Sequence, residues 1–268
     1  MSEMHEANRR KWDASASRWK ERRDSDTDWR RCVIDPSIGF DPGTLEAIQR
    51  HVDPDGSDVC VLGSGDNLAA FSMVGLGAKV VSVDISHSQL EIARGRAAEL
   101  GVNVRFVCAD ICDVAELSDS AFDLACSLGG VSVWITDLPK SYAEVSRLLR
   151  PGGIFVSQEA HPVTFPFADD DQSLEMHYFD HGPKEYLYSP ADGKSIGLAE
   201  QSGPDAGHSS YQCHWTIADR VNGIVRSGLQ IVELVETESS DLADWRERPA
   251  CGLPDELIIV ARKPAQRI

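Results

Sequence analysis

The chain has 268 residues, 42% of them hydrophobic and 26% charged, and its formal net charge is −17. This is an ordinary globular composition, long enough for one large α/β domain or two small ones. Because so acidic a surface repels phosphate groups, nucleic acids and anionic membranes are poor candidates for a partner.

The first 31 residues differ from this average, because they carry nine basic side chains against seven acidic ones. Such mixed patterning favours a helix with a charged, solvated surface. The segment lacks the apolar stretch of a secretory signal, and the chain has no run of about 18 apolar residues. We therefore expect a cytoplasmic protein without a membrane span.

The seven cysteines are odd in number and form no C-x-x-C pair. They indicate reduced thiols rather than a disulfide framework. Cys60, Cys108 and Cys126 fall within apolar runs, where a free cysteine behaves as a small hydrophobe. We expect no metal site.

From residue 58 onward, apolar runs alternate with segments of helical period. The runs predict strands at 58–62, 79–83, 104–108, 122–128 and 153–159. Between them we expect a helix over 68–75, one capped by Ser86 and stopped by Gly101, and one entered at Asp137 and Pro139. Apolar strands separated by helices predict a doubly wound α/β fold with a parallel sheet covered on both faces.

Residues 161–212 break this rhythm with a mixture of aromatic, Gly, Pro and Asp residues. A loop of that length is uncommon unless it is a lid or a binding segment. The pattern then resumes with a helix at about 215–227 and strands at 229–236 and 256–262. We divide the chain into an N-terminal helical lid (1–50), an α/β core (51–160), a lid or substrate-binding insertion (161–213) and a C-terminal helix with a strand pair (214–268).

The turn after the first strand is the first chemical signal. Gly63 and Gly65 let the backbone approach a ligand and leave helix N–H groups free to bind it. Asp84 ends the second strand, 21 residues after Gly63, where a carboxylate can accept hydrogen bonds from both ribose hydroxyls. A dinucleotide fingerprint needs Gly or Ala at position 68, which is Leu68. The pattern therefore favours a mononucleoside cofactor over NAD or FAD.

Two later motifs agree with this interpretation. Asp110 and Ile111 follow the third strand, where the carboxylate could accept from an adenine amino group and Ile111 could pack on the ring. The sequence R-P-G-G at 150–153 precedes the fifth strand. Taken in order, these motifs resemble the class I S-adenosylmethionine-dependent methyltransferases, in the small-molecule branch that contains the ubiquinone and menaquinone C-methyltransferases.

The resemblance implies a Rossmann-like, mostly parallel seven-stranded sheet with an antiparallel C-terminal strand and a substrate-lid insertion. It implies S-adenosylmethionine as cofactor, with its methionine part on the glycine turn, its ribose on Asp84, its adenine at Asp110 and its methyl group near Ser127. The cofactor-binding residues are then Gly63, Ser64, Gly65, Asp66, Asp84, Ile85, Asp110, Ile111, Ser127 and Leu128.

Two positions depart from the family's pattern. Val61 stands where an acidic residue is common, and Asn67 stands where the third glycine is usual. Asp66 could replace the missing carboxylate by accepting from the ammonium group of the cofactor.

Methyl transfer from a sulfonium is an in-line displacement, so the protein's main task is alignment. A general base is needed only where the acceptor is a hydroxyl or a carbon acid. His161, after the fifth strand, is the candidate base, and a histidine that merely caps or packs before Pro162 is the alternative. Candidate substrate-binding residues are Gln158, Glu159, His177, Tyr178, Tyr186 and His214.

The leading hypothesis is a methyltransferase acting on a small molecule, as a monomer or a homodimer. The alternatives are a non-catalytic protein that binds S-adenosylmethionine or S-adenosylhomocysteine, and an NAD-dependent oxidoreductase. The fourth strand ends in S-L-G-G-V-S-V and lacks the N-P-P-Y type tetrad used on amino groups of bases and glutamine. This absence disfavours nucleic acids and that class of protein substrate.

Overall fold

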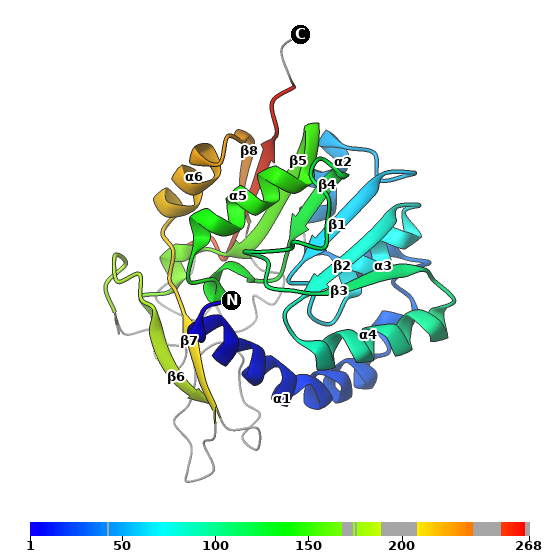
Figure 1. Ribbon diagram of the computed structural model, residues 1–268, viewed down its shortest axis with the longest axis horizontal. Coiled ribbons are helices and arrows are strands. Elements are labelled where there is room, and N and C mark those ends of the chain that lie inside the picture. The colour runs from blue at the N-terminus through cyan, green and yellow to red at the C-terminus, as the bar shows by residue number, and fades with distance from the viewer. Residues whose placement is uncertain (42, 168–173, 175, 189–207, 238–252, 266–268) are drawn as a thin grey trace.

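The computed structural model describes residues 1–41, 43–167, 174, 176–188, 208–237 and 253–265. Among these residues the central sheet has seven strands in the order β3-β2-β1-β4-β5-β9-β8 (Figure 1). The strands are β1 (Asp58–Leu62), β2 (Lys79–Asp84), β3 (Val104–Cys108), β4 (Phe122–Ser127), β5 (Leu149–Ala160), β8 (Gln230–Thr237) and β9 (Glu256–Arg262). The first five pair in parallel, and β9 is antiparallel to both of its neighbours, β5 and β8. The predicted fold class is confirmed.

Helices cover both faces of the sheet (Figure 1). On one face, α5 (Leu138–Leu148) and α6 (Ile217–Arg226) contribute Tyr142, Val145 and Ile224 to one hydrophobic core. On the other face, α2 (Thr44–His51), α3 (Leu68–Gly75) and α4 (His87–Leu100) contribute Ile48 and Phe71, among others, to a second core. The strands between the two cores are therefore apolar on both sides, as the sequence pattern predicted.

Local sequence signals set the ends of these helices. The Ser86 side chain caps α4 by accepting from the Gln89 amide at 3.1 Å, and Gly101 ends it in a left-handed conformation at φ +67°. Asp137 caps α5 by accepting from the Lys140 amide. Helix α6 begins two residues later than predicted, because Thr216 and Asp219 form a capping box just before and within its first turn.

The N-terminal residues form one long helix, α1 (Glu3–Asp26), which runs along one edge of the sheet beside α4 and β7 (Figure 1). Two short 3₁₀ turns, η1 (Asp28–Arg30) and η2 (Pro36–Gly39), connect it to α2. The insertion holds η4 (Pro162–Thr164) and an antiparallel pair, β6 (Lys184–Tyr188) and β7 (His208–Gln212), where no stable period was expected. Residues 168–173, 175 and 189–207 of it lie outside the described residues. The division of the chain into four parts stays a prediction.

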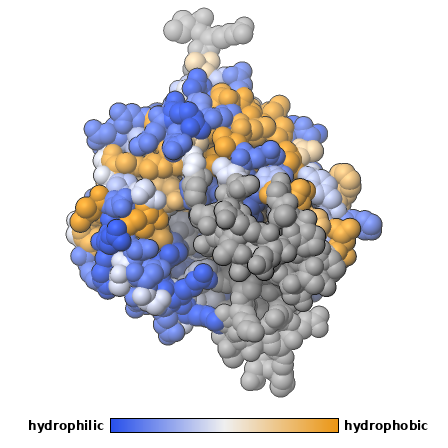
Figure 2. Space-filling view, turned by 180° about the vertical axis from the view of Figure 1, so that it is seen from behind, coloured by the Kyte–Doolittle hydropathy of each residue, from blue (hydrophilic) through white to orange (hydrophobic). Residues whose placement is uncertain are grey.

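No helix in the described ranges combines the length and apolarity that crossing a membrane requires. The face turned away from the view of Figure 1 mixes hydrophilic and hydrophobic residues (Figure 2). Single exposed apolar side chains such as Val225 and Val232 are normal on protein surfaces.

The turn between β1 and α3 passes very close to the segment that follows β4. A Cβ atom placed on Gly63 would lie 2.5 Å from a methyl carbon of Val131, whereas one on Gly65 would meet nothing within 4 Å. Both glycines have positive φ angles, +64° and +50°. Of these two glycines, Gly63 alone combines a left-handed backbone with a close contact.

We expect Gly63→Ala to destabilise the fold more than Gly65→Ala does. Both variants strain the backbone by about 1–2 kcal/mol, and the clash with Val131 adds about 1–3 kcal/mol to Gly63→Ala alone. Chemical denaturation of both variants measures the difference. Equal losses of stability would show that Val131 moves aside freely.

The first residue of β9 makes the stability of the fold depend on pH. Burial, with Asp41 and Asp255 nearby, raises the pKa of Glu256 from 4.5 to about 7. Its ionised form is thus disfavoured in the folded state, so this group's contribution to stability falls as pH rises from 4.5 through 7. We expect Glu256→Gln to raise the melting temperature clearly at pH 8 and much less at pH 5. The same shift at both pH values would contradict this assignment.

Candidate functional site

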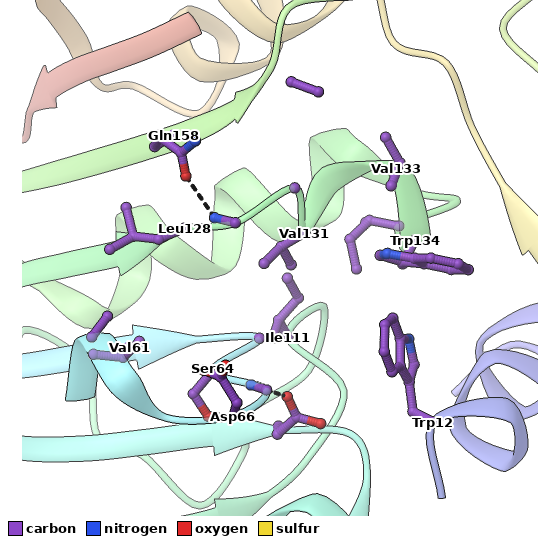
Figure 3. Close-up of a pocket in the computed structure, with 18 of the residues that line it drawn as sticks. Trp12, Val61, Ser64, Asp66, Ile111, Leu128, Val131, Val133, Trp134 and Gln158 are labelled. Carbon is purple, nitrogen blue, oxygen red and sulfur yellow. Dashed lines mark hydrogen bonds between the residues drawn. The ribbon is translucent and has the colours of Figure 1, made fainter. Parts of the chain in front are cut away.

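A cavity of about 700 Å³ lies at the carboxyl ends of the parallel strands, where open α/β sheets bind ligands. Its volume falls in the range of small-molecule and cofactor sites. The lining comes from the glycine turn, the end of β2, the segment after β4, the end of β5, and helix α1 (Figure 3). Of the residues predicted from the sequence, those that line it are Gly63, Ser64, Gly65, Asp66, Asp84, Ile85, Asp110, Ile111, Leu128, Gln158 and His214.

Asp84 ties two of these segments together. One carboxylate oxygen accepts from the Gly65 amide and the other from the Ser86 amide, both at 2.8 Å. Burial raises the pKa of Asp84, and the two amide hydrogen bonds oppose this shift by favouring the charged form. A buried carboxylate thus stands between the glycine turn and the first turn of α4.

The position that lacks the family's third glycine keeps a glycine-like backbone. Asn67 has φ +67°, in the left-handed region that asparagine tolerates better than most residues. Its side-chain amide donates to the Gly65 carbonyl at 2.7 Å and its amide oxygen accepts from Ser82. The Asn67 side chain therefore supports the turn from within, whereas Val61 lines the cavity.

Helix α1 reaches the other two predicted carboxylates. Arg23 donates to one oxygen of Asp66 from Nε at 2.8 Å and from Nη2 at 2.5 Å. His5 Nδ1 lies 2.7 Å from Asp110, and His5 Nε2 accepts from the Thr136 amide at 2.9 Å. Since Nε2 is an acceptor, Nδ1 carries the proton and donates to Asp110. Helix α1 is thus a wall of the cavity.

Burial disfavours ionisation of Asp110, but the hydrogen bonds from His5 and from the Cys112 amide outweigh it, and the pKa of Asp110 is lowered. His5, Asp110 and Cys112 also bring three potential metal-ligand atoms within 4.8 Å of one another. Both His5 ring nitrogens are already used in hydrogen bonds. We therefore interpret this group as a hydrogen-bond chain that anchors α1.

Aromatic side chains of α1 and of the segment after β4 complete this wall. Trp12 meets Trp134 edge to face with ring centroids 5.0 Å apart, and Figure 3 shows the two rings facing each other beside the cavity. Lys11 Nζ lies 3.6 Å from the Trp134 ring centroid, and burial lowers the pKa of Lys11 to about 7. The sequence predicts an N-terminal helical lid but none of these contacts.

His161 does not line the cavity. Its side chain is 3% exposed, Nε2 lies 3.0 Å from Glu236, and Nδ1 accepts from the Val163 amide to cap η4. Both ring nitrogens thus have partners in the local structure, as the capping alternative expects, and the base role stays a prediction.

The remaining candidates also lie outside the cavity lining. Ser127 is buried within β4, and Glu159 is buried against Ser132 and Arg220. The Tyr178 hydroxyl accepts from the Ile217 amide at the start of α6, which is a structural role. His177 is exposed, and Tyr186 belongs to the β6–β7 pair. The alternation of side chains along strands and the packing of the insertion direct these residues away from the cavity, and their expected roles stay predictions.

Comparisons with known proteins agree with this geometry. A family model described as "Methyltransferase domain" matches residues 60–157. A ubiquinone biosynthesis O-methyltransferase from Xanthomonas axonopodis pv. citri is 28% identical over 157 residues, which cover 58% of this chain and 62% of that protein. A sterol 4-C-methyltransferase from Caenorhabditis elegans is 32% identical over 119 residues, covering 44% of this chain and 34% of that protein.

The fold is also similar to solved structures. An S-adenosylmethionine-dependent methyltransferase from Mesorhizobium loti aligns with a TM-score of 0.60 and 24% identity, over 81% of this chain and 96% of that one. S-adenosylmethionine is the cofactor of such proteins. Sequence motifs, family match and strand order agree: residues 60–157 match a methyltransferase domain, and the chain has the fold of S-adenosylmethionine-dependent methyltransferases.

Proposed function

We propose that the protein transfers a methyl group from S-adenosylmethionine to a small-molecule acceptor. The observation that carries this proposal is the convergence of Asp84, the glycine turn and the Asp110–Ile111 pair on one cavity at the carboxyl edge of the sheet. The named activities of the relatives support it, although the aligned stretch spans only 62% of the first relative's length.

The residues around the cavity fit this cofactor. Each oxygen of Asp84 accepts one amide and has a lone pair left for a ribose hydroxyl. Ile111 offers an apolar face for adenine beside the Asp110 carboxylate, and the free backbone at Gly65 leaves space for the methionine part. The bound cofactor supplies an electrophilic methyl group on a sulfonium, so that this chain has to bind, align and exclude water.

The cofactor and helix α1 share two carboxylates. Arg23 occupies one oxygen of Asp66, and His5 occupies one oxygen of Asp110. The ammonium group of the cofactor can donate to the other oxygen of Asp66, and the adenine amino group to the other oxygen of Asp110. Alternatively, these groups can displace Arg23 and His5 from the oxygens that they bind. We propose that α1 closes over the cofactor through these bonds, which makes residues 1–50 the lid expected from the sequence.

The acceptor meets a second part of the lining, which comes from residues after β5 and from the end of β7: Thr164, Phe165, Phe167, Gln212 and His214. The His214 ring stacks on Phe165 with centroids 4.8 Å apart, and burial lowers the pKa of His214 to about 4. The imidazole is therefore neutral at physiological pH. This wall favours an uncharged acceptor with an apolar ring or chain over an anionic one.

The cysteine thiols support a cytoplasmic location for the protein. The six described cysteines are free, and Cys60 and Cys126 are fully buried. Thiols in this state favour a reducing compartment such as the cytoplasm. The acidic net charge of −17 disfavours nucleic acid as a partner, and the choice between monomer and homodimer stays open.

We expect calorimetric titration to show binding of S-adenosylmethionine and S-adenosylhomocysteine but not of NAD. Asp84→Asn should weaken S-adenosylhomocysteine binding by about 1.5–3 kcal/mol, because it removes a charge-assisted hydrogen bond. The matched control is Asp123→Asn. Asp123 also accepts a hydrogen bond from a backbone amide, that of Asp58 at the start of β1, and it lies outside the cavity lining. Binding of NAD alone would refute the proposed function. Equal effects of the two variants would show that the ribose does not bind to Asp84.

We expect a metabolite extract incubated with a methyl-labelled donor to carry the label in uncharged, apolar products. Phe165→Ala should slow this transfer about tenfold while leaving S-adenosylhomocysteine affinity unchanged, because it opens the acceptor wall. Phe179→Ala is the control, because Phe179 is 79% exposed and lies outside the cavity lining. Label found in anionic products would contradict the proposed class of acceptor. Tight cofactor binding without any labelled product would favour the non-catalytic alternative.

A further inference from the structure

The segment between β4 and α5, residues 128–135, is here called the cavity loop. It contains η3 (Ser132–Trp134), and all its residues except Ser132 line the cavity. Val131 packs against Gly63, and Trp134 faces Trp12 of α1 (Figure 3). The placement of this loop therefore sets the shape of the proposed cofactor and acceptor site.

The last residues of β5 hold the cavity loop at two points. The Gln158 side-chain oxygen accepts from the Gly129 amide at 2.7 Å, as the dashed line in Figure 3 marks. Glu159 accepts from the Ser132 amide at 3.1 Å and from the Ser132 hydroxyl at 2.8 Å. Because side chains alternate along a strand, Gln158 reaches the cavity, whereas Glu159 binds the loop from behind.

Glu159 is a buried charge with a buried counter-charge. Its side chain is 2% exposed, and Arg220 of α6, which is fully buried, lies 3.4 Å from it. Burial raises the pKa of Glu159, and Arg220 and Ser132 oppose this shift. Arg220 Nε also donates to the Trp215 carbonyl at 3.3 Å, just before α6. The buried Glu159–Arg220 pair therefore connects α6, β5 and the cavity loop.

A buried ion pair is weak evidence for stability, because apolar residues of similar volume often stabilise a core as well or better. What such a core could not supply is an acceptor for the Ser132 amide and hydroxyl. Both Ser132 groups are buried, and leaving them without an acceptor would remove one of the two points at which β5 holds the loop.

We propose that Glu159, with Arg220 as its counter-charge, is a positioning residue that acts through Ser132 to hold the cavity loop against the glycine turn. The proposal deepens the proposed methyl-transfer function and rests on it for its significance. It replaces the substrate-binding role expected for Glu159 with control of the loop behind the site.

The test compares two buried serines that both donate to Glu159. Ser132 belongs to the cavity loop, whereas Ser157 lies within β5 and donates from 3.4 Å. In the full-length protein, we expect Ser132→Ala to weaken S-adenosylhomocysteine binding about tenfold and to speed amide hydrogen exchange selectively in residues 128–136. Ser132→Thr, which keeps the hydroxyl, should restore both values to within about twofold, and Ser157→Ala should change neither.

Glu159→Gln should reproduce the local increase in exchange, because the amide keeps the shape of the side chain but accepts fewer hydrogen bonds. Equal exchange in the loop of the wild-type protein and Ser132→Ala would overturn the proposal. Increased exchange spread over the whole sheet in Ser132→Ala, or equal effects of the two serine variants, would also overturn it by assigning the Ser132–Glu159 bond to general stability. A wild-type protein that does not bind S-adenosylhomocysteine would refute the proposed function instead, and the exchange data would still decide whether Glu159 positions the loop.

Discussion

The site depends on one close approach, between the turn after β1 and the loop after β4. Neighbouring parallel strands bring their carboxyl ends to one edge, so β1 and β4, paired from Val59 to Leu62, deliver these two segments side by side. Gly63 has no side chain, and it meets Val131 at a distance that a Cβ atom would not allow. The cavity then lies between fixed walls.

Charge explains how the N-terminal helix joins these walls. The sequence favours a solvated helix of mixed charge, yet several of its charges pair with the core: Arg23 with Asp66, Asp24 with Arg96, and His5 with Asp110. Exposed ion pairs contribute little each, but the His5–Asp110 bond is almost wholly buried. The slightly basic helix is thus held against an acidic core, and two of the acidic groups that bind it also line the cofactor cavity.

The sequence could predict what depends on local pattern. Strand alternation, the glycine turn, Asp84 and Asp110 follow from spacing along the chain, and the structure brings them together. Contacts between distant segments could not be predicted, because His5 and Asp110 are 105 positions apart and Asn8 donates to the Tyr211 carbonyl across 203 positions. The direction of side chains at strand ends was the other obstacle, since a strand end known to within one residue leaves the face of each side chain undecided.

That ambiguity at the end of β5 has a structural meaning. The sequence predicts a shared substrate-binding role for Gln158 and Glu159, but the two side chains face opposite sides of the sheet, and both hold the same loop. The Glu159–Arg220 ion pair connects the layer formed by α5 and α6 to the loop that lines the cavity, although α5 and α6 themselves do not line it. Gly223 permits this packing, because a Cβ atom there would lie 2.8 Å from the Tyr142 ring. The geometry of the proposed cofactor site is therefore determined on both faces of the sheet, and a substitution in α6 can alter it without touching a ligand.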